Sequence, residues 1–224
     1  MTKRGGKVEF THPRLIITEG IEDTAFLRAL IKSRKIKEFN VYPNIDVGRE
    51  EGNSAFKSSA IACLAITGFD AVNDILLVAD NDGDPKKSFS EICAQIEAAR
   101  TEGPLTRNWG KMTAVNTKAT ADPSLGCWLW PEINKVGCLE TLLWQCIEKN
   151  HAKEAKCVEQ ALACSGANAW PQNKIDKAKM RCFFSIKCKK NPTVNLSLLW
   201  RDCPEIIPLE DKIFDPISDF LSAF

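Results

Sequence analysis

The run Ile75–Ala79 (Ile-Leu-Leu-Val-Ala) constrains the fold more than any other segment of the chain. Its side chains are apolar at successive positions, so a strand formed here has two apolar faces instead of one. Such a strand belongs in the centre of a parallel sheet, where helices cover both faces. The run ends on Asp80-Asn81-Asp82-Gly83-Asp84-Pro85, so polar side chains follow the strand directly.

Strands and helices alternate along the first part of the chain. Further strands are expected at Arg14–Thr18, Phe39–Tyr42 and Cys127–Trp130, with segments of helical apolar spacing between them. This alternation predicts an α/β fold with a central parallel sheet flanked by helices. Beyond about residue 150 the apolar spacing is helical. We therefore expect an α/β domain over residues 1–150 and a helical extension over 151–224, packed on the same core.

The same patterns predict where helices and loops lie. Helices are expected around Leu27–Ile31, Ser54–Thr67, Phe89–Ile96, Leu139–Ile147, Val158–Leu162, Lys174–Ser185 and Ile217–Phe224. A polar loop is expected over Asp46–Asn53, and an excursion rich in polar and breaker residues over Thr101–Ala121.

The charge balance limits the classes of partner. The 30 basic and 29 acidic side chains leave a formal net charge of +1, which excludes the cationic coat of an architectural nucleic-acid binder. No apolar run approaches the roughly 20 residues of a membrane span, and no apolar segment follows the basic start Met1–Lys7. We expect a cytoplasmic protein with no membrane association.

The cysteines and histidines limit the kind of metal site. None of the 10 cysteines has the two-residue spacing of a zinc ribbon, and most fall at apolar positions, so we expect reduced thiols in the core. The 2 histidines are too few for a histidine-rich site. Any metal would therefore be held by carboxylates and would be a hard cation such as Mg²⁺ or Mn²⁺.

Acidic residues follow two of the expected strands. Glu19 comes after the first, and Asp80 and Asp82 come after the run Ile75–Ala79; Asp23 lies one helical turn beyond Glu19. Ligands of open parallel sheets bind at the carboxyl ends of the strands, and converging carboxylates repel unless a divalent cation neutralises them. This placement predicts a Mg²⁺ site. Asp23 could instead complement a helix dipole.

The segment after Asp80 is also compatible with a polar turn, in which Asp84 or Ser88 caps the next helix. In addition, it matches most ligand positions of an EF-hand calcium loop. However, Pro85 stands where that loop needs glycine, and a strand precedes the segment instead of a helix. We exclude the EF-hand.

Together these residues resemble a known family. Glu19-Gly20 with Asp23, followed by Asp80-Asn81-Asp82, resembles the topoisomerase/primase (Toprim) signature of a glutamate and an aspartate-x-aspartate pair. The segments Trp128-Leu129-Trp130-Pro131, Gly137-Cys138-Leu139-Glu140 and Asp176-Lys177-Ala178-Lys179 are similar to stand-alone Toprim-like proteins related to the nuclease half of OLD-type (overcoming lysogenisation defect) proteins. The resemblance implies a Toprim-like, Rossmann-like sheet with metal-dependent phosphodiester chemistry.

The resemblance also implies a set of site residues. The positions that match the metal site of OLD-type nucleases are Glu19, Asp23, Asp80, Asp82, Glu140 and Lys177. It implies that the acids bind Mg²⁺ or Mn²⁺, that Glu19 binds metal or acts as general base, and that Lys177 neutralises charge on the phosphate. Glu132, another acid after a strand, could replace Glu140, and Lys177 could belong to a solvated basic face.

The resemblance extends to partners. OLD-type proteins carry an ATPase domain, but this sequence has no phosphate-binding loop, so a separate ATPase of OLD/ABC type is implied, as in two-gene phage-defence systems. Nucleic acid, DNA or RNA, is the expected substrate, and we allow for a homodimer. Two alternatives stay open: a non-catalytic Toprim-like module that binds a partner, and a receiver-type protein that accepts a phosphoryl group on an aspartate.

Overall fold

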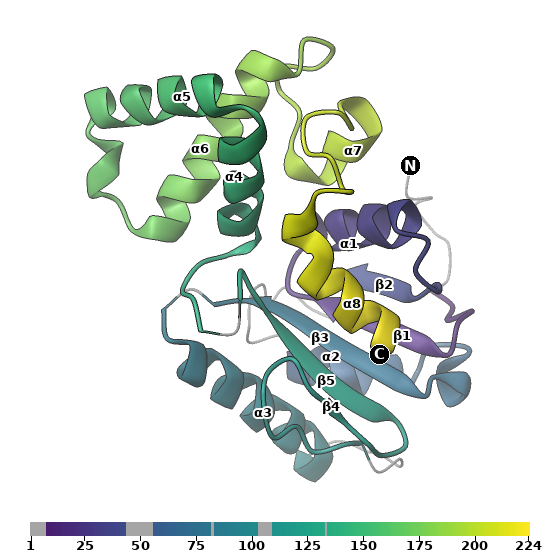
Figure 1. The fold of residues 1–224 in the computed structure, drawn as a ribbon. Helices are drawn as coiled ribbons and strands as arrows, with labels where there is room; N and C mark the ends of the chain where they lie inside the picture. The colour runs from purple at the N-terminus through teal and green to yellow at the C-terminus, as the bar shows by residue number, and fades with distance from the viewer. Residues whose placement is uncertain (1–7, 44–55, 82, 103–108, 133) are drawn as a thin grey trace.

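The computed structural model describes residues 8–43, 56–81, 83–102, 109–132 and 134–224. At its centre is a five-stranded sheet in the order β2-β1-β3-β5-β4 (Figure 1). The strands are β1 (Arg14–Thr18), β2 (Asn40–Pro43), β3 (Asp74–Asp80), β4 (Lys118–Ala119) and β5 (Ser124–Trp130). Neighbouring strands are parallel except β4, which pairs antiparallel with β5 at the edge. The expected α/β fold with a parallel central sheet is confirmed.

The central strand β3 divides its side chains between two apolar clusters. Leu76 and Val78 belong to one cluster, whereas Ile75, Leu77 and Ala79 belong to the other. Successive side chains of a strand point to opposite faces, so two covered faces require an unbroken apolar run. Both neighbours of β3 in the sheet are parallel to it, as the sequence predicts for this segment.

Helices cover both faces of the sheet. Those described are α1 (Ile21–Ser33), α2 (Phe56–Cys63), α3 (Pro85–Glu102), α4 (Leu139–Asn150), α5 (Ala152–Ser165), α6 (Gln172–Lys187), α7 (Leu199–Asp202) and α8 (Asp215–Ala223). Helices α2 and α3 supply one cluster, and α1 with α4 to α8 supplies the other. In Figure 1, α8 lies over the sheet beside α1, while α5 and α6 stand beyond α4. The helical C-terminal part is therefore as expected.

Some expectations fall outside the described residues or differ in detail. The loop expected over Asp46–Asn53 lies outside them, as does part of the Thr101–Ala121 excursion, whose described end contains the unexpected strand β4. Among the described residues, no helix combines the length and apolar character needed to cross a membrane.

The cysteine expectation is wrong for one pair. Cys188, which follows α6, and Cys203, which follows α7, form a disulfide with their Cα atoms 5.9 Å apart. Both side chains are buried in the same apolar cluster, so tertiary packing of the C-terminal helices brings them together. The other described cysteines are free thiols, and three of them are exposed: Cys157, Cys164 and Cys182.

Candidate metal centre

The carboxyl ends of β1 and β3 bring two acids into contact. The backbone N–H of Glu19 donates to the Val78 carbonyl at 2.9 Å, which continues the pairing of these strands by one residue. The Glu19 carboxylate then accepts the backbone N–H of Asp80 at 3.0 Å. Glu19 and Asp80 therefore lie side by side at the edge where ligands of parallel sheets bind.

Asp23 lies in the first turn of α1 and faces the same place. Its Oδ2 accepts the backbone N–H of Gly20 at 3.2 Å, and its Oδ1 accepts the indole N–H of Trp130 at 2.8 Å. The residue is 7% exposed. It thus satisfies a donor at the start of α1, as a first-turn acid does, while Trp130 of β5 fixes its orientation beside Glu19.

The N-terminus of α4 meets Asp80. The Oδ1 atom of Asp80 accepts the backbone N–H of Leu139, the first residue of α4, at 3.1 Å. The chain reaches this point because the backbones of Asn81 and Gly137 exchange two hydrogen bonds, of 2.9 and 2.8 Å. Gly137 has φ of +148°, and a Cβ there would come within 2.6 Å of Thr141 Oγ1. Only glycine allows this close approach.

Two further side chains of the α4 N-terminus join the cluster. Cys138 is fully buried and Glu140 is 6% exposed. One potential ligand atom each from Asp80, Cys138 and Glu140 lies within 4.8 Å of the other two. Among the described residues, the groups that share hydrogen bonds with the Glu140 side chain are the Glu22 carboxyl and the Cys138 thiol, which are acids themselves.

Helix α6 supplies the nearby positive charge. Nζ of Lys177 lies 3.9 Å from Oδ2 of Asp80, and its side chain is 48% exposed. The preceding residue, Asp176, is buried and accepts the Thr141 hydroxyl at 2.6 Å and the Gln172 amide at 2.8 Å. The Thr141–Asp176 hydrogen bond joins α6 to α4, and this junction directs Lys177 toward the acids.

Burial and the charges of neighbouring acids oppose ionisation of Asp23, Asp80 and Glu22. Desolvation, followed by the charges of Glu19 and Glu140, raises the pKa of Asp23 to about 7. Desolvation, followed by the charges of Asp23, Glu19 and Glu140, raises the pKa of Asp80 well above its usual value, although Lys177 opposes this. The pKa of Glu22 is also raised, first by burial and then by Glu140. A cation in the cluster would relieve this repulsion.

The structure thus brings together most of the residues that the sequence predicts. Glu19, Asp23, Asp80, Glu140 and Lys177 meet at one edge of the sheet, whereas Asp82 lies outside the described residues. Glu132 is exposed and pairs with Lys135 at 3.0 Å, so Glu140 is the acid after β5 that enters the cluster. The roles of these residues stay predictions.

Sequence reasoning missed Glu22 and Cys138. Glu22 stands between Glu19 and Asp23, and its helical position gives no indication that it turns toward Glu140. The position of Cys138 offered one signal, because it immediately precedes an expected helix at a strand-end loop. The helix cap expected after Asp80 is correct for Asp84, whose Oδ1 accepts the Lys86 backbone N–H at 2.9 Å.

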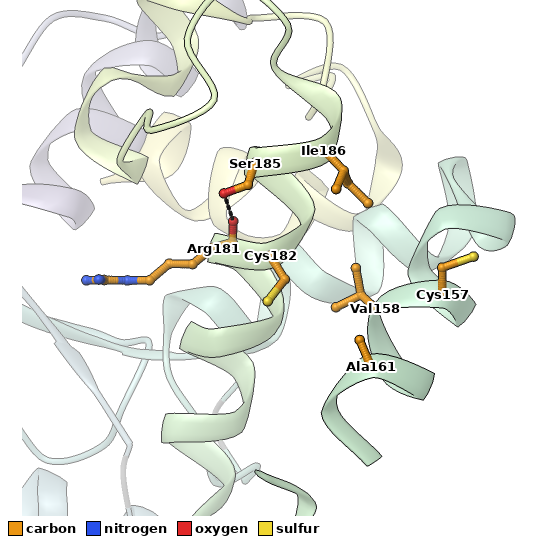
Figure 2. Close-up of a pocket in the computed structure, with 7 residues that line it drawn as sticks. All are labelled: Cys157, Val158, Ala161, Arg181, Cys182, Ser185 and Ile186. Carbon is orange, nitrogen blue, oxygen red and sulfur yellow. Dashed lines mark hydrogen bonds between the residues drawn. The ribbon is translucent and has the colours of Figure 1, made fainter. Parts of the chain in front are cut away.

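A groove of about 490 Å³ lies elsewhere, between α5 and α6 (Figure 2). It is lined by Cys157, Val158, Ala161, Arg181, Cys182, Ser185 and Ile186. Figure 2 shows the Arg181 side chain extending away from Val158 and Ala161. The Arg181 charge lowers the pKa of the Glu22 carboxyl, so Arg181 lines the groove and also acts on the acidic cluster.

Comparisons with known proteins identify a family but not an activity. A search of curated proteins found no match, and a search of solved structures found none either. One family model, described as "Protein of unknown function (DUF3226)", matches residues 13–224. Because this match spans most of the sequence, the chain belongs to the DUF3226 family.

Proposed function

We propose that the chain is a Mg²⁺- or Mn²⁺-dependent phosphodiesterase that hydrolyses DNA or RNA. The observation that carries the proposal is the convergence of Glu19, Asp23, Asp80 and Glu140 at the carboxyl edge of the sheet, with Lys177 3.9 Å from Asp80. Buried carboxylates with so little compensating charge are typical of divalent-cation sites. The resemblance to Toprim and OLD-type nucleases supports the same chemistry.

Each side chain has a task consistent with its position. Asp80, Glu19 and Glu140 would hold the cations, and Asp23 would complete the site from α1. When bound, the cations would lower the pKa of a water molecule and offset phosphate charge. Lys177, partly exposed, would neutralise the charge that develops on the phosphate.

The surface of α6 supports a phosphate-containing substrate. Lys174, Lys177 and Arg181 are spaced three and four residues apart, which places them on one face of the helix. The charges of Lys177 and Arg181 both lower the pKa of Glu22, so this face continues from the acidic cluster. Among the described residues, the Arg181 guanidinium has neither a hydrogen bond nor an ion pair. A basic stripe that leads out of a metal site fits a nucleic-acid backbone.

Cleavage assays test the proposal. Purified protein is incubated with plasmid DNA, single-stranded DNA and tRNA, with Mn²⁺ or with EDTA. We expect Mn²⁺-dependent cleavage that falls by about 10-fold to 100-fold or more in Asp80→Asn and in Glu140→Gln, because each loses a metal ligand. Glu132→Gln is the matched control, since Glu132 follows the same strand but is exposed.

Two results would contradict the site assignment: cleavage that persists in Asp80→Asn, which indicates a contaminating nuclease, and a loss in Glu132→Gln equal to that in Glu140→Gln. The partner ATPase and the homodimer stay predictions; size-exclusion chromatography with light scattering checks the homodimer.

A further inference from the structure

We propose that Cys138 is a metal ligand, and that with Asp80 and Glu140 it lets the site bind thiophilic divalent metals of the Zn²⁺ and Co²⁺ class in addition to the Mg²⁺ or Mn²⁺ of the proposed function. The inference deepens the proposed function, on which it rests because Asp80 and Glu140 are shared. It changes the chemistry expected from the sequence, which considered carboxylates alone.

The geometry places the thiol among the acids. Cys138 is fully buried, and one potential ligand atom each from Cys138, Asp80 and Glu140 lies within 4.8 Å of the other two. Zn–S distances are about 2.3 Å and Zn–O distances about 2.0–2.2 Å, so ligand atoms of one ion lie at most about 4.5 Å apart, and a small side-chain rotation would bring any pair near the 4.8 Å limit within this range. The three ligands come from two fixed points of the fold, the end of β3 and the start of α4.

Glu140 has acidic neighbours within this group. The residue is buried, and one of its carboxylate oxygens lies within 4.8 Å of ligand atoms of Asp80 and Cys138. The Glu22 carboxyl and the Cys138 thiol, which are acids themselves, share hydrogen bonds with it. A divalent cation can replace the protons that such neighbouring acids share, and buried acidic groups are commonly stabilised in this way.

The position of the cysteine is unusual for a structural residue. Cys138 occupies the N-cap of α4, where serine, threonine, aspartate and asparagine are preferred because their oxygen accepts a backbone N–H. Here Thr141 Oγ1 accepts the Cys138 backbone N–H at 3.1 Å and gives its own proton to Asp176. The Thr141 hydroxyl therefore does not donate to Sγ, 3.6 Å away, and the sulfur lone pairs stay available to a metal.

A thiolate widens the range of metals that the site can bind. Soft sulfur ligands select Zn²⁺ and related transition metals, whereas Mg²⁺ prefers oxygen ligands in octahedral geometry. Binding requires that the Cys138 S–H bond breaks, that the proton leaves to solvent, and that the sulfur electron pair forms the bond to the metal. No oxidation state changes in this step.

Cobalt absorption provides a readout independent of activity. The experiment uses the full chain with Cys157→Ser, Cys164→Ser and Cys182→Ser, which removes the exposed thiols. We expect one equivalent of Co²⁺ to produce a thiolate-to-cobalt charge-transfer band in the near ultraviolet. Cys138→Ser should abolish the band and weaken Co²⁺ binding by about tenfold or more, with little change in Mg²⁺ binding. Cys146 is another buried thiol of α4, and Cys146→Ser should keep both the charge-transfer band and the affinity for Co²⁺.

The outcomes separate this inference from the proposed function. One outcome is that Co²⁺ binds, that Asp80→Asn abolishes this binding, and that no thiolate band appears. This outcome overturns the inference and leaves the proposed function intact. A band that survives Cys138→Ser also overturns it. Failure of Co²⁺, Mn²⁺ and Mg²⁺ alike to bind, measured by equilibrium dialysis, overturns both.

A second measurement does not depend on the folding of Cys138→Ser. X-ray absorption of the Zn²⁺-loaded chain that lacks the exposed thiols should show one sulfur scatterer at about 2.3 Å together with oxygen scatterers. A shell of oxygen alone would refute Cys138 as a ligand.

Discussion

The Asp23 carboxyl occupies a place where its ionisation is disfavoured. Burial and the charges of Glu19 and Glu140 raise its pKa to about 7 from 3.8, against the hydrogen bond from Trp130. The folded chain therefore holds the proton more tightly than the unfolded chain. Stability from this group is complete below about pH 4 and is lost as the pH rises through 7, by up to about 4 kcal/mol.

The substitution Asp23→Asn tests this pH dependence. Asparagine cannot ionise, so we expect urea unfolding in EDTA to show a smaller fall in stability from pH 5 to pH 8 than in the original chain. At pH 5 the variant should be less stable by about 1 kcal/mol, because the amide cannot accept from both Gly20 and Trp130. At pH 8 the order should reverse.

Exposed Glu132→Gln is the control for a general charge effect and should leave the slope unchanged. Adding Mn²⁺ should reduce the slope of the original chain, since a bound cation stabilises the ionised acids. If the free energy of unfolding depends on pH in the same way in Asp23→Asn and in the original chain, the raised pKa of Asp23 is contradicted.

At this scale the sequence predicts which acids follow strands but not which of them turn inward. Glu132 and Glu140 both follow β5, and their spacing does not separate them. The backbones of Asn81 and Gly137 are paired, and this pairing fixes the loop between β5 and α4. In the folded chain Glu140 is buried and Glu132 is exposed. That pairing links segments far apart in sequence, which local patterns do not encode.

At the scale of elements, the junction of α4 and α6 controls where Lys177 lies. Asp176 is 2% exposed and accepts hydrogen bonds from Thr141 of α4 and Gln172 of its own helix. The sequence predicts α6, and Lys177 is the residue of this helix to which it gives a role in the site. The structure adds that the preceding carboxylate, Asp176, links α6 to α4 beside the acidic cluster.

Asp176→Ala should separate these helices locally. The Thr141 hydroxyl loses its acceptor, so we expect a loss of about 1–3 kcal/mol in the free energy of unfolding, measured with urea. Because Lys177 is then no longer held toward Asp80, kcat for nucleic-acid cleavage should fall with KM nearly unchanged.

Asp176→Asn keeps an acceptor for Thr141. Compared with Asp176→Ala, it should restore much of the free energy of unfolding and much of kcat. Gln172→Ala removes an exposed residue from the same carboxylate and should cost little. Equal kcat values for Asp176→Ala and the original chain would show that α6 does not position Lys177.

Short elements escape prediction for a related reason. Strand β4 has two residues, Lys118 and Ala119, and helix α7 has four, Leu199–Asp202. Neither is long enough to display a period of apolar residues. Lys118 lies at the sheet edge through the pairing of β4 with β5, and its ammonium pairs with Asp74 at 2.6 Å, a contact between distant parts of the chain.

For the whole molecule, the sequence predicts the fold class because long apolar patterns reflect two covered faces of one sheet. The division at residue 150 has no visible linker, since α4 ends at Asn150 and α5 begins at Ala152. One apolar cluster contains residues of α1, the sheet and α4 to α8. This shared core favours a single folding unit over two that melt separately.

Phe26 provides the test of that unit. It is fully buried in α1, and its ring centre lies 5.6 Å from that of Trp130, 5.4 Å from that of Trp200 and 5.4 Å from that of Phe214. These rings come from the sheet and from the C-terminal segment. Removing the Phe26 ring therefore weakens the attachment of both at once.

We expect Phe26→Ala to cost about 3–5 kcal/mol, while Ile186→Ala, at a position 55% exposed, should change stability by less than about 0.5 kcal/mol. Within each protein, far-ultraviolet circular dichroism and tryptophan fluorescence should report coincident urea transitions, because α5 and α6 pack on α4, whose apolar side chains belong to the same cluster as Phe26. Two separated midpoints would instead show that residues 151–224 unfold independently of the sheet that carries the acidic cluster.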